Sequence, residues 1–246
     1  MTASTPPAEP HRPEPPRLPG GLDIAFLTNE PGACELVLVR HGQQALPDRR
    51  DLRVGDIVDP PLSAIGRRQA EHLGERFRHR RVDAVYSSHL SRAFDTGRAV
   101  AVHHGLEPEV YEDLREVEVF SDLPADRRAA DVLGADYLAG IRDRMARERR
   151  WDIYPGTESS VAFRNRVINR IDAIAATNPG RRVVIACHGG VINAYLAELL
   201  GARQDMLFRP AHTAVNVFVA GEHGRRAVRS LGDVAHLEHD DELVTY

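Results

Sequence analysis

Short apolar runs alternate along the chain with stretches whose apolar residues recur at helical spacing. The apolar runs predict strands at 35–40, 82–86, 182–187, 214–220 and 226–231. Helical spacing predicts helices at 63–80, 91–104, 125–133, 136–150, 157–177 and from 190 to 200. Because strands and helices alternate, we expect an α/β fold of three layers, α/β/α, with a mostly parallel central sheet.

The first 33 residues differ in character from the rest of the chain. They contain half of the 16 prolines, which lack an amide donor and favour extended backbone, so residues 1–33 are predicted to form a largely disordered arm. The alternation of Leu22, Ile24 and Phe26 predicts that 22–27 pair with a sheet edge.

The rest of the chain, residues 34–246, is expected to form one domain. A polar, arginine-rich stretch at about 117–156 interrupts the alternation of strands and helices and is predicted to be a small helical cap inserted into that domain. Its second helix carries five arginines, which indicate either a solvated face or recognition of an anionic substrate: Arg142, Arg144, Arg147, Arg149 and Arg150.

Composition excludes several classes of protein. The 246 residues include 32 basic and 36 acidic ones, and a net charge of −4 argues against a nucleic-acid partner. All basic residues are arginines, so neither a Schiff-base lysine nor a phosphate-loop lysine is present. Two cysteines are too few for a disulfide scaffold, and no apolar run is long enough for a membrane span. We expect a cytoplasmic protein without a membrane partner.

Two predicted strands end in histidine followed by glycine. The segments are Arg40-His41-Gly42 and His188-Gly189-Gly190. In parallel sheets, ligands bind beyond the carboxyl ends of strands and near helix N-termini, so both histidines are candidates for chemistry. Either one alone is more often a structural residue.

Further segments occur in a definite order around these histidines. Asp59-Pro60-Pro61-Leu62-Ser63 precedes Gly66, and Ser87-Ser88-His89-Leu90-Ser91-Arg92-Ala93 follows the second predicted strand, before Thr96. Together with the histidine segments they resemble the histidine phosphatase superfamily, also called phosphoglycerate mutase-like. The resemblance covers about 35–116 and 157–201 and, loosely, 212–231.

His41 is the predicted nucleophile. A neutral imidazole has an ordinary pKa of about 6.5 and is a good phosphoryl acceptor near neutral pH, provided that a hydrogen bond fixes its other nitrogen. The family resemblance implies the same role, with a phosphohistidine intermediate. It also implies that His188 takes part in catalysis.

The phosphoryl group needs fixed donors around its oxygens, because its transfer is promoted mainly by positioning and positive charge. The guanidinium groups of Arg40 and Arg92 and a ring N–H of His188 can supply these donors, as the family resemblance also implies. Gln43, directly after the first motif, fits the family pattern. A looser match at His212-Thr213 adds the start of the strand at 214, with Thr213 as a candidate through its backbone amide.

The leaving alkoxide needs a proton. The resemblance implies that a glutamate after a leucine-x-glutamate step supplies it, and here that step is Leu114-Arg115-Glu116. Glu116 is therefore the predicted general acid, and Glu118 is the reserve. The chain continues as Val117-Glu118-Val119-Phe120, without the Gly/Trp-containing segment usual in the family, so the choice between the two glutamates stays open.

Two competing chemistries are less well supported. A cysteine phosphatase needs an arginine six positions after its cysteine, and Cys187 has Asn193 there. Near the C-terminus, residues with metal-ligating side chains cluster at His236, His239, Asp240, Asp241 and Glu242. Nothing around this cluster resembles a buried strand end, so it is predicted to be a solvated tail. We expect no metal and no cofactor.

The sequence thus predicts a metal-independent phosphatase that acts on a small phosphorylated substrate, a phosphomonoester. One alternative is a phosphoglycerate mutase, although the run from Glu116 to His188 is shorter than the insertion of that group. Another is a protein that binds phosphate esters without turnover. Self-association into a homodimer stays open.

Overall fold

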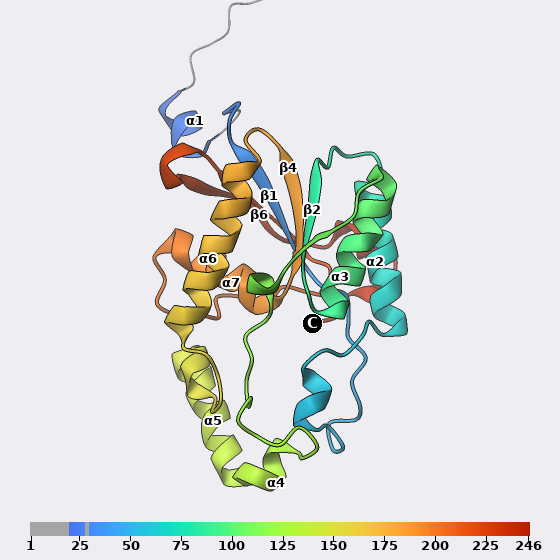
Figure 1. Cartoon of the computed structure of the whole chain (residues 1–246), viewed down its shortest axis with the longest axis vertical. Coiled ribbons are helices and arrows are strands. Elements are labelled where there is room, and N and C mark those ends of the chain that lie inside the picture. The colour runs from blue at the N-terminus through green and yellow to red at the C-terminus, as the bar shows by residue number, and fades with distance from the viewer. Residues whose placement is uncertain (1–19, 28–29) are drawn as a thin grey trace, which may run out of the picture.

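The protein is a three-layer α/β/α structure (Figure 1). The computed structural model describes residues 20–27 and 30–246, so most of the predicted arm lies outside the described residues. The strands are β1 Cys34–Arg40, β2 Ala84–Ser88, β3 Glu109–Tyr111, β4 Arg182–Cys187, β5 Val215–Ala220 and β6 Arg226–Asp233. The helices are α1 Gly21–Ala25, α2 Ala64–Phe77, α3 Ser91–Ala101, α4 Ala129–Leu133, α5 Ala135–Glu148, α6 Ser160–Thr177 and α7 Gly189–Leu200.

The central sheet has the order β3-β2-β4-β1-β5-β6. Strands β3, β2, β4 and β1 run parallel, whereas β5 and β6 are antiparallel to their neighbours. The register of β1 and β4 places Arg40 opposite Cys187 at the carboxyl ends of the two central strands. The predicted mostly parallel α/β fold is therefore confirmed.

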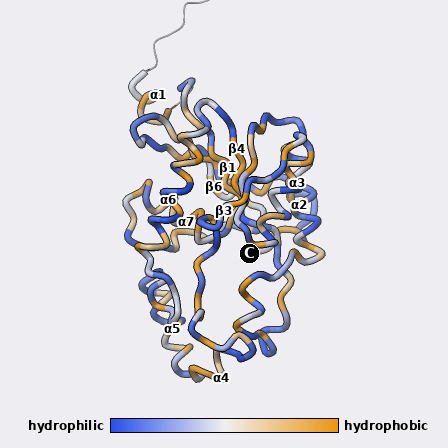
Figure 2. Tube along the Cα trace, in the orientation of Figure 1, coloured by the Kyte–Doolittle hydropathy of each residue, from blue (hydrophilic) through white to orange (hydrophobic). Residues whose placement is uncertain are grey.

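Alternating residues of the central strands build two separate cores. Successive side chains of a strand point to opposite faces of the sheet. In β1, Leu36 and Leu38 pack with residues of α6 and α7, whereas Val37 and Val39 pack with residues of α2 and α3. Figure 2 shows the central strands largely in the hydrophobic colour, whereas the surrounding helices alternate between hydrophobic and hydrophilic residues. Burial on both faces explains the continuous apolar runs.

Serine side chains fix the starts of the two longest helices of the layers. Ser63 Oγ accepts a hydrogen bond from the Gly66 amide at 3.0 Å before α2, and Ser159 Oγ accepts one from the Ala162 amide at 3.1 Å before α6. Such caps satisfy amide donors that have no partner within the helix. The helices predicted at 63–80 and 157–177 are confirmed, with their ends shifted by a few residues.

One local expectation was wrong, and one strand was not predicted. Residues 22–27 do not pair with a sheet edge: the described part forms α1, with Gly20 and Asp23 in a capping arrangement, while Leu27 is buried against β5 and β6. Alternation over three residues is too short to distinguish a strand from one helical turn. Strand β3 was not predicted, because it has only three residues.

The C-terminal segment is not a solvated tail. Leu237 and Leu243 are buried, and His236 lies 3.0 Å from the hydroxyl of Thr213. The Gln69 side chain of α2 donates to the Leu243 carbonyl at 2.6 Å. Asp241 and Glu242 do face solvent, but Leu237 within the cluster and Leu243 directly after it hold the chain against the domain. Two leucines six residues apart are too sparse to predict an amphipathic element.

Residues 117–156 contain α4 and α5 and lie at the end of the molecule opposite α1 (Figure 1). The carboxyl ends of the parallel strands point toward this end. No helix in the part of the chain that the structure describes is long and apolar enough to cross a bilayer.

The packing of α2 against α3 predicts opposite effects of alanine at two helical glycines. A Cβ atom at Gly74 would lie 2.3 Å from the Ala99 carbonyl oxygen, whereas one at Gly140 in α5 meets nothing within 4 Å. We expect Gly74→Ala to lower the free energy of unfolding by about 1–3 kcal/mol through overpacking. Gly140→Ala should raise it by about 0.5–1 kcal/mol through helix propensity. Urea unfolding measures both, and equal effects would contradict the packing argument.

Candidate active site

The sheet register brings the two predicted histidines together. His41 follows the last residue of β1 and His188 follows the last residue of β4, and their ring centroids are 5.1 Å apart. The His41 amide donates to the Cys187 carbonyl at 2.9 Å, which extends the pairing by one residue. Both rings are almost fully buried, with exposures of 4% and 0%.

A backbone carbonyl fixes the His41 ring. Nδ1 lies 2.7 Å from the carbonyl oxygen of Gly42. A carbonyl only accepts, so the proton lies on Nδ1 and the lone pair lies on Nε2, which accepts a long hydrogen bond from Arg92 Nε at 3.4 Å. Burial and the charges of Arg92 and Arg40 hold the pKa of His41 well below its ordinary value. The ring is therefore neutral at neutral pH.

Arginines flank this ring from two elements. Arg92, in the first turn of α3, places Nε 3.4 Å from His41 Nε2 and Nη1 3.2 Å from the Val58 carbonyl oxygen. Arg40 donates from Nη1 to the Pro210 carbonyl at 2.7 Å. Burial lowers the pKa of Arg40 to about 10, so its guanidinium stays charged near neutral pH, and burial also lowers the pKa of Arg92.

His188 has two ring nitrogens without a hydrogen-bond partner among the described residues. A buried N–H that finds no acceptor costs about 1–3 kcal/mol. Burial, followed by His41 and Arg92, lowers the pKa of His188 well below its ordinary value. The ring is therefore neutral near neutral pH and carries one N–H that no described residue accepts, although His188 itself is not among the residues that line the cavity beside His41.

Glu116 is held by two backbone amides. Its Oε1 accepts from Val117 at 3.0 Å, and its Oε2 accepts from Gly190, in the first turn of α7, at 3.0 Å. A Cβ atom at Gly190 would lie 2.2 Å from Glu116 Oε1, so only glycine permits this approach. Glu118, in contrast, is exposed and lies 3.9 Å from Arg115.

A cavity of about 480 Å³ opens in front of these groups. Its polar end holds Arg40, His41, Arg92 and Glu116. Most of the remaining wall is apolar and comes from two segments outside the sheet: Val54, Ile57, Val58, Val117, Val119, Leu123 and Ala125. The cavity therefore combines a cationic end suited to phosphate with a largely apolar space for an organic group.

Comparison with known proteins identifies the family. The model of the histidine phosphatase superfamily (branch 1) matches residues 36–233. The chain belongs to the histidine phosphatase superfamily. It is 30% identical to phosphoglycerate mutase-like protein 4 of Arabidopsis thaliana over 214 residues, which cover 83% of this chain and 87% of that protein.

Other relatives in the superfamily are named as phosphatases. The chain is 31% identical over 178 residues to glucosyl-3-phosphoglycerate phosphatase of Mycolicibacterium vanbaalenii, covering 69% of this chain and 76% of the relative. The solved structure of a mycobacterial glucosyl-3-phosphoglycerate phosphatase matches with a TM-score of 0.67 at 26% identity, covering 81% and 99% of the two chains. A phosphoglycerate mutase of Bacillus anthracis, at 21% identity and TM-score 0.68, shares the fold.

Gln43, a predicted phosphate-binding residue, does not line the cavity. Its amide donates to Gln69 Oε1 at 2.8 Å and its side-chain carbonyl accepts from Ser63 Oγ at 2.8 Å, so it ties the loop after β1 to α2. The neighbouring Gln44 lines the cavity instead, with its buried Oε1 unpartnered among the described residues. A shift of one residue in a loop leaves no periodic signal in the sequence.

Thr213 also differs from its expected role. Its amide donates to the Arg40 carbonyl at 3.1 Å and its hydroxyl to the His212 carbonyl at 2.8 Å, so the fully buried residue has no free amide for phosphate. The sequence pattern assigns no role to the side chain of the preceding His212. Its ring nevertheless lies 5.7 Å from that of His41, and burial lowers its pKa to about 3.

Acid is expected to destabilise the folded protein through His41, His188 and His212. Each imidazole titrates near pH 6.5 in the unfolded chain, but burial depresses its pKa in the folded state. The unfolded state therefore binds more protons below that pH. The contribution of these histidines to the free energy of unfolding should be fully present above about pH 6.5. Below that pH, the free energy of unfolding should fall by about 1.4 kcal/mol per pH unit for each histidine.

Urea unfolding as a function of pH measures this slope. His41→Asn should reduce the slope by about one proton. The matched control is His223→Asn, since the His223 side chain is 89% exposed, and it should retain the wild-type slope. An unchanged slope in His41→Asn would show that burial does not hold this ring neutral.

Proposed function

We propose that the protein is a metal-independent phosphatase of the histidine acid phosphatase type, which hydrolyses a phosphomonoester through a phosphohistidine on His41. The observation that carries this proposal is the 2.7 Å contact between His41 Nδ1 and the Gly42 carbonyl. It leaves the lone pair on Nε2 for attack on phosphorus, and Arg92 Nε, which donates to that atom at 3.4 Å, is within reach of a phosphoryl oxygen. A nucleophile in the correct tautomer therefore lies where phosphate oxygens find positive charge.

In the first step, the lone pair of His41 Nε2 attacks phosphorus and the bond from phosphorus to the ester oxygen breaks. Arg40, Arg92 and the N–H of His188 stabilise the charge on the remaining phosphoryl oxygens. A protonated Glu116 gives its proton to the departing alkoxide, which leaves as the alcohol. The products of this step are phosphohistidine and the Glu116 carboxylate.

In the second step, the Glu116 carboxylate takes a proton from a water molecule as the water attacks phosphorus. The bond from phosphorus to Nε2 breaks, which returns the lone pair to His41 and releases inorganic phosphate. Glu116 is protonated again and the cycle closes. The two amides that hold this carboxylate, from Val117 and Gly190, keep it in one place through both steps.

The size of the site supports hydrolysis of the phosphohistidine over transfer of its phosphoryl group back to the organic intermediate, as in a mutase. A mutase must retain its organic intermediate and exclude water. Here a cavity of about 480 Å³ adjoins another of about 700 Å³, and both are lined by Arg40 and Glu116. Such a space admits water once the alcohol has left. Mutase activity that depends on bisphosphoglycerate would favour the other reaction.

Replacing the nucleophile tests the proposal directly. With a chelator present, the wild type should release phosphate from an aryl phosphate, and His41→Ala should lower kcat by at least about a thousandfold. The exposed His223→Ala variant is the control and should match the wild type. Retained turnover in His41→Ala would overturn the phosphohistidine route, and loss of wild-type turnover with chelator would overturn metal independence. Ester binding without any phosphate release would indicate a binding protein.

Substrates with different leaving groups distinguish the roles of Glu116 and Glu118. Glu116→Gln should lower kcat by about a hundredfold to ten-thousandfold for an alkyl phosphate and by less for a nitrophenyl phosphate, whose leaving phenolate needs no proton. Glu118→Gln is the matched variant, because Glu118 lines the cavity but contacts Arg115 rather than α7. A larger loss in Glu118→Gln would reverse the assignment. The two substrates are compared by steady-state phosphate release.

A further inference from the structure

The direction of the Arg40 guanidinium depends on a single hydrogen bond. Its Nη1 donates to the Pro210 carbonyl at 2.7 Å, and within the described residues its side chain makes no other hydrogen bond. Arginine is a long side chain with much rotamer freedom, so without this contact the guanidinium would sample several directions. Nε and Nη2 remain for phosphoryl oxygens in the cavity that Arg40 lines. What holds the Pro210 carbonyl therefore also aims these donors.

The Arg40 side chain is bordered by two segments of backbone. One is the loop that carries Pro210, and the other is the start of α7. A Cβ atom at Gly189, the first residue of α7, would lie 3.9 Å from Arg40 Nε and 3.8 Å from Pro210 Cγ. A shift of either segment relative to the other would therefore turn the guanidinium.

Asn193, in the second turn of α7, ties these two segments together. Its Nδ2 donates to the Gly189 carbonyl at 2.9 Å and to the Phe208 carbonyl at 3.0 Å. Its Oδ1 accepts from the Leu207 amide at 2.8 Å and from the Phe208 amide at 3.1 Å. One side chain thus holds the loop two residues before Pro210 and the first carbonyl of the helix.

These contacts use the whole hydrogen-bonding capacity of the Asn193 amide. A carboxamide has two donors and two acceptor sites, and all four are occupied by backbone groups. The residue is 4% exposed. Asparagine is also a poor helix former, so helix propensity does not account for it inside α7. A side chain without a spare donor or acceptor acts on its neighbours rather than on a ligand.

The backbone between Phe208 and Pro210 is stiff. Proline restricts its own φ and also restricts the residue before it, which is Arg209. Pro210 is in addition buried. Fixing Phe208 therefore fixes the Pro210 carbonyl, and that carbonyl fixes Arg40 Nη1. The path from Asn193 to the guanidinium consists of hydrogen bonds and one restrained turn.

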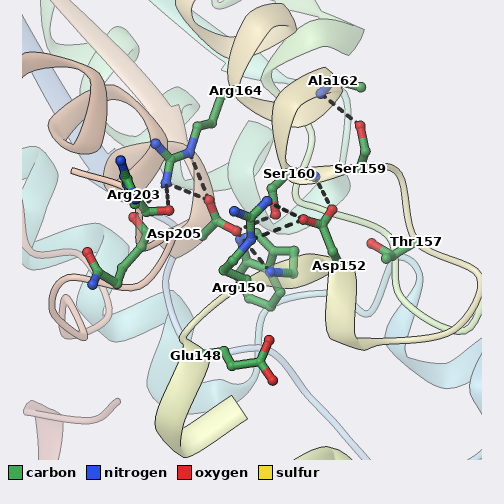
Figure 3. Close-up of polar contacts among 12 residues, drawn as sticks. Glu148, Arg150, Asp152, Thr157, Ser159, Ser160, Ala162, Arg164, Arg203 and Asp205 are labelled. Carbon is green, nitrogen blue, oxygen red and sulfur yellow. Dashed lines mark hydrogen bonds and ion pairs between the residues drawn. The ribbon is translucent and has the colours of Figure 1, made fainter. Parts of the chain in front are cut away.

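The first half of the same loop has a separate anchor (Figure 3). Asp205, which is 2% exposed, accepts from the Trp151 amide at 2.9 Å and from Arg164 Nε at 2.8 Å, and it also binds Ser160 Oγ. These contacts fasten the loop to α6 and to the turn after α5. They end five residues before Pro210, so the half of the loop that meets Arg40 relies on Asn193.

We propose that Asn193 is a positioning residue for phosphoryl transfer, which acts through Pro210 to aim the Arg40 guanidinium at the phosphoryl oxygens. This inference rests on the proposed phosphatase function and deepens it with a residue that does not contact the reacting atoms. Direction matters because transfer is promoted by positive charge that is already in place before the reaction. A guanidinium that must first be ordered contributes less.

A double-mutant cycle of Asn193→Ala and Arg40→Ala tests the path. Calorimetry with inorganic phosphate gives Kd, and nitrophenyl phosphate gives kcat/KM. In the wild-type background, Asn193→Ala should weaken phosphate binding and lower kcat/KM by about tenfold to a hundredfold. In the Arg40→Ala background it should change either quantity by less than about threefold, because no guanidinium remains to be aimed. Equal losses in the two backgrounds overturn the proposal.

The chain offers a matched control for loss of stability. Asn178, at the end of α6, is 2% exposed, and its Nδ2 donates at 2.8 Å both to the Tyr86 hydroxyl and to the Ile174 carbonyl. Asn178→Ala should lower the urea midpoint while phosphate affinity and kcat/KM stay at wild-type values. If it lowers them as much as Asn193→Ala does, the effect of Asn193 is one of general stability and the proposal is overturned.

A second variant covers the case in which Asn193→Ala does not fold. Pro210→Gly keeps the contacts of Asn193 but releases the backbone that carries the carbonyl. It should weaken phosphate binding in the wild-type background and have little effect in the Arg40→Ala background. Wild-type affinity in Pro210→Gly, or equal losses in both backgrounds, would contradict the path through Pro210.

Failure of the proposed function would look different. If the wild type releases no phosphate from any ester but the cycle in phosphate affinity shows the expected dependence on Arg40, the phosphatase assignment fails and the positioning of Arg40 by Asn193 stands. If the wild type is an active phosphatase and the losses are equal in both backgrounds, the reverse holds.

Discussion

The parallel pairing of β1 with β4 is the constraint on which the site depends. Its register ends with Arg40 beside Cys187, so the next residue of each strand is a histidine. Neither strand has room to shift, because both faces of each are buried in separate cores. A slip by one residue would turn every apolar side chain to the wrong core and separate the two rings. The packing that stabilises the sheet therefore also fixes the relative positions of the two histidines.

The second constraint is the start of α7. Gly190, in the first turn of α7, lets the Glu116 carboxylate approach its amide because it has no Cβ atom. The same turn thus places His188 beside His41, the proposed nucleophile, and holds a carboxylate from a distant segment. Partial positive charge at the helix start favours the oxygens of a phosphate group beside it. Sheet and helix contribute different halves of the site.

Much of this arrangement is predictable from the sequence because it has a strong local cause. Buried strands give continuous apolar runs, and the position of His41 and His188 at strand ends is enough to make them candidates for chemistry. A phosphate-binding role for Arg92 can be predicted only together with Arg40 and His188, since an arginine in the first turn of a helix is usually solvated. The placements of Gln43, Thr213 and His212 cannot be predicted, because loop geometry and tertiary hydrogen bonds decide them. The same holds for the path of the chain after β6.

The walls of the first cavity have a consequence for how such a protein changes over time. Val54, Ile57, Leu123 and Ala125 line it but belong to neither core of the sheet. Exchanging them alters the shape offered to the organic part of a ligand while the strands and their histidines keep their packing. Chemistry and selectivity are thus under separate mutational control. A lineage with this architecture can acquire new substrates by small steps, without passing through an unfolded or inactive ancestor.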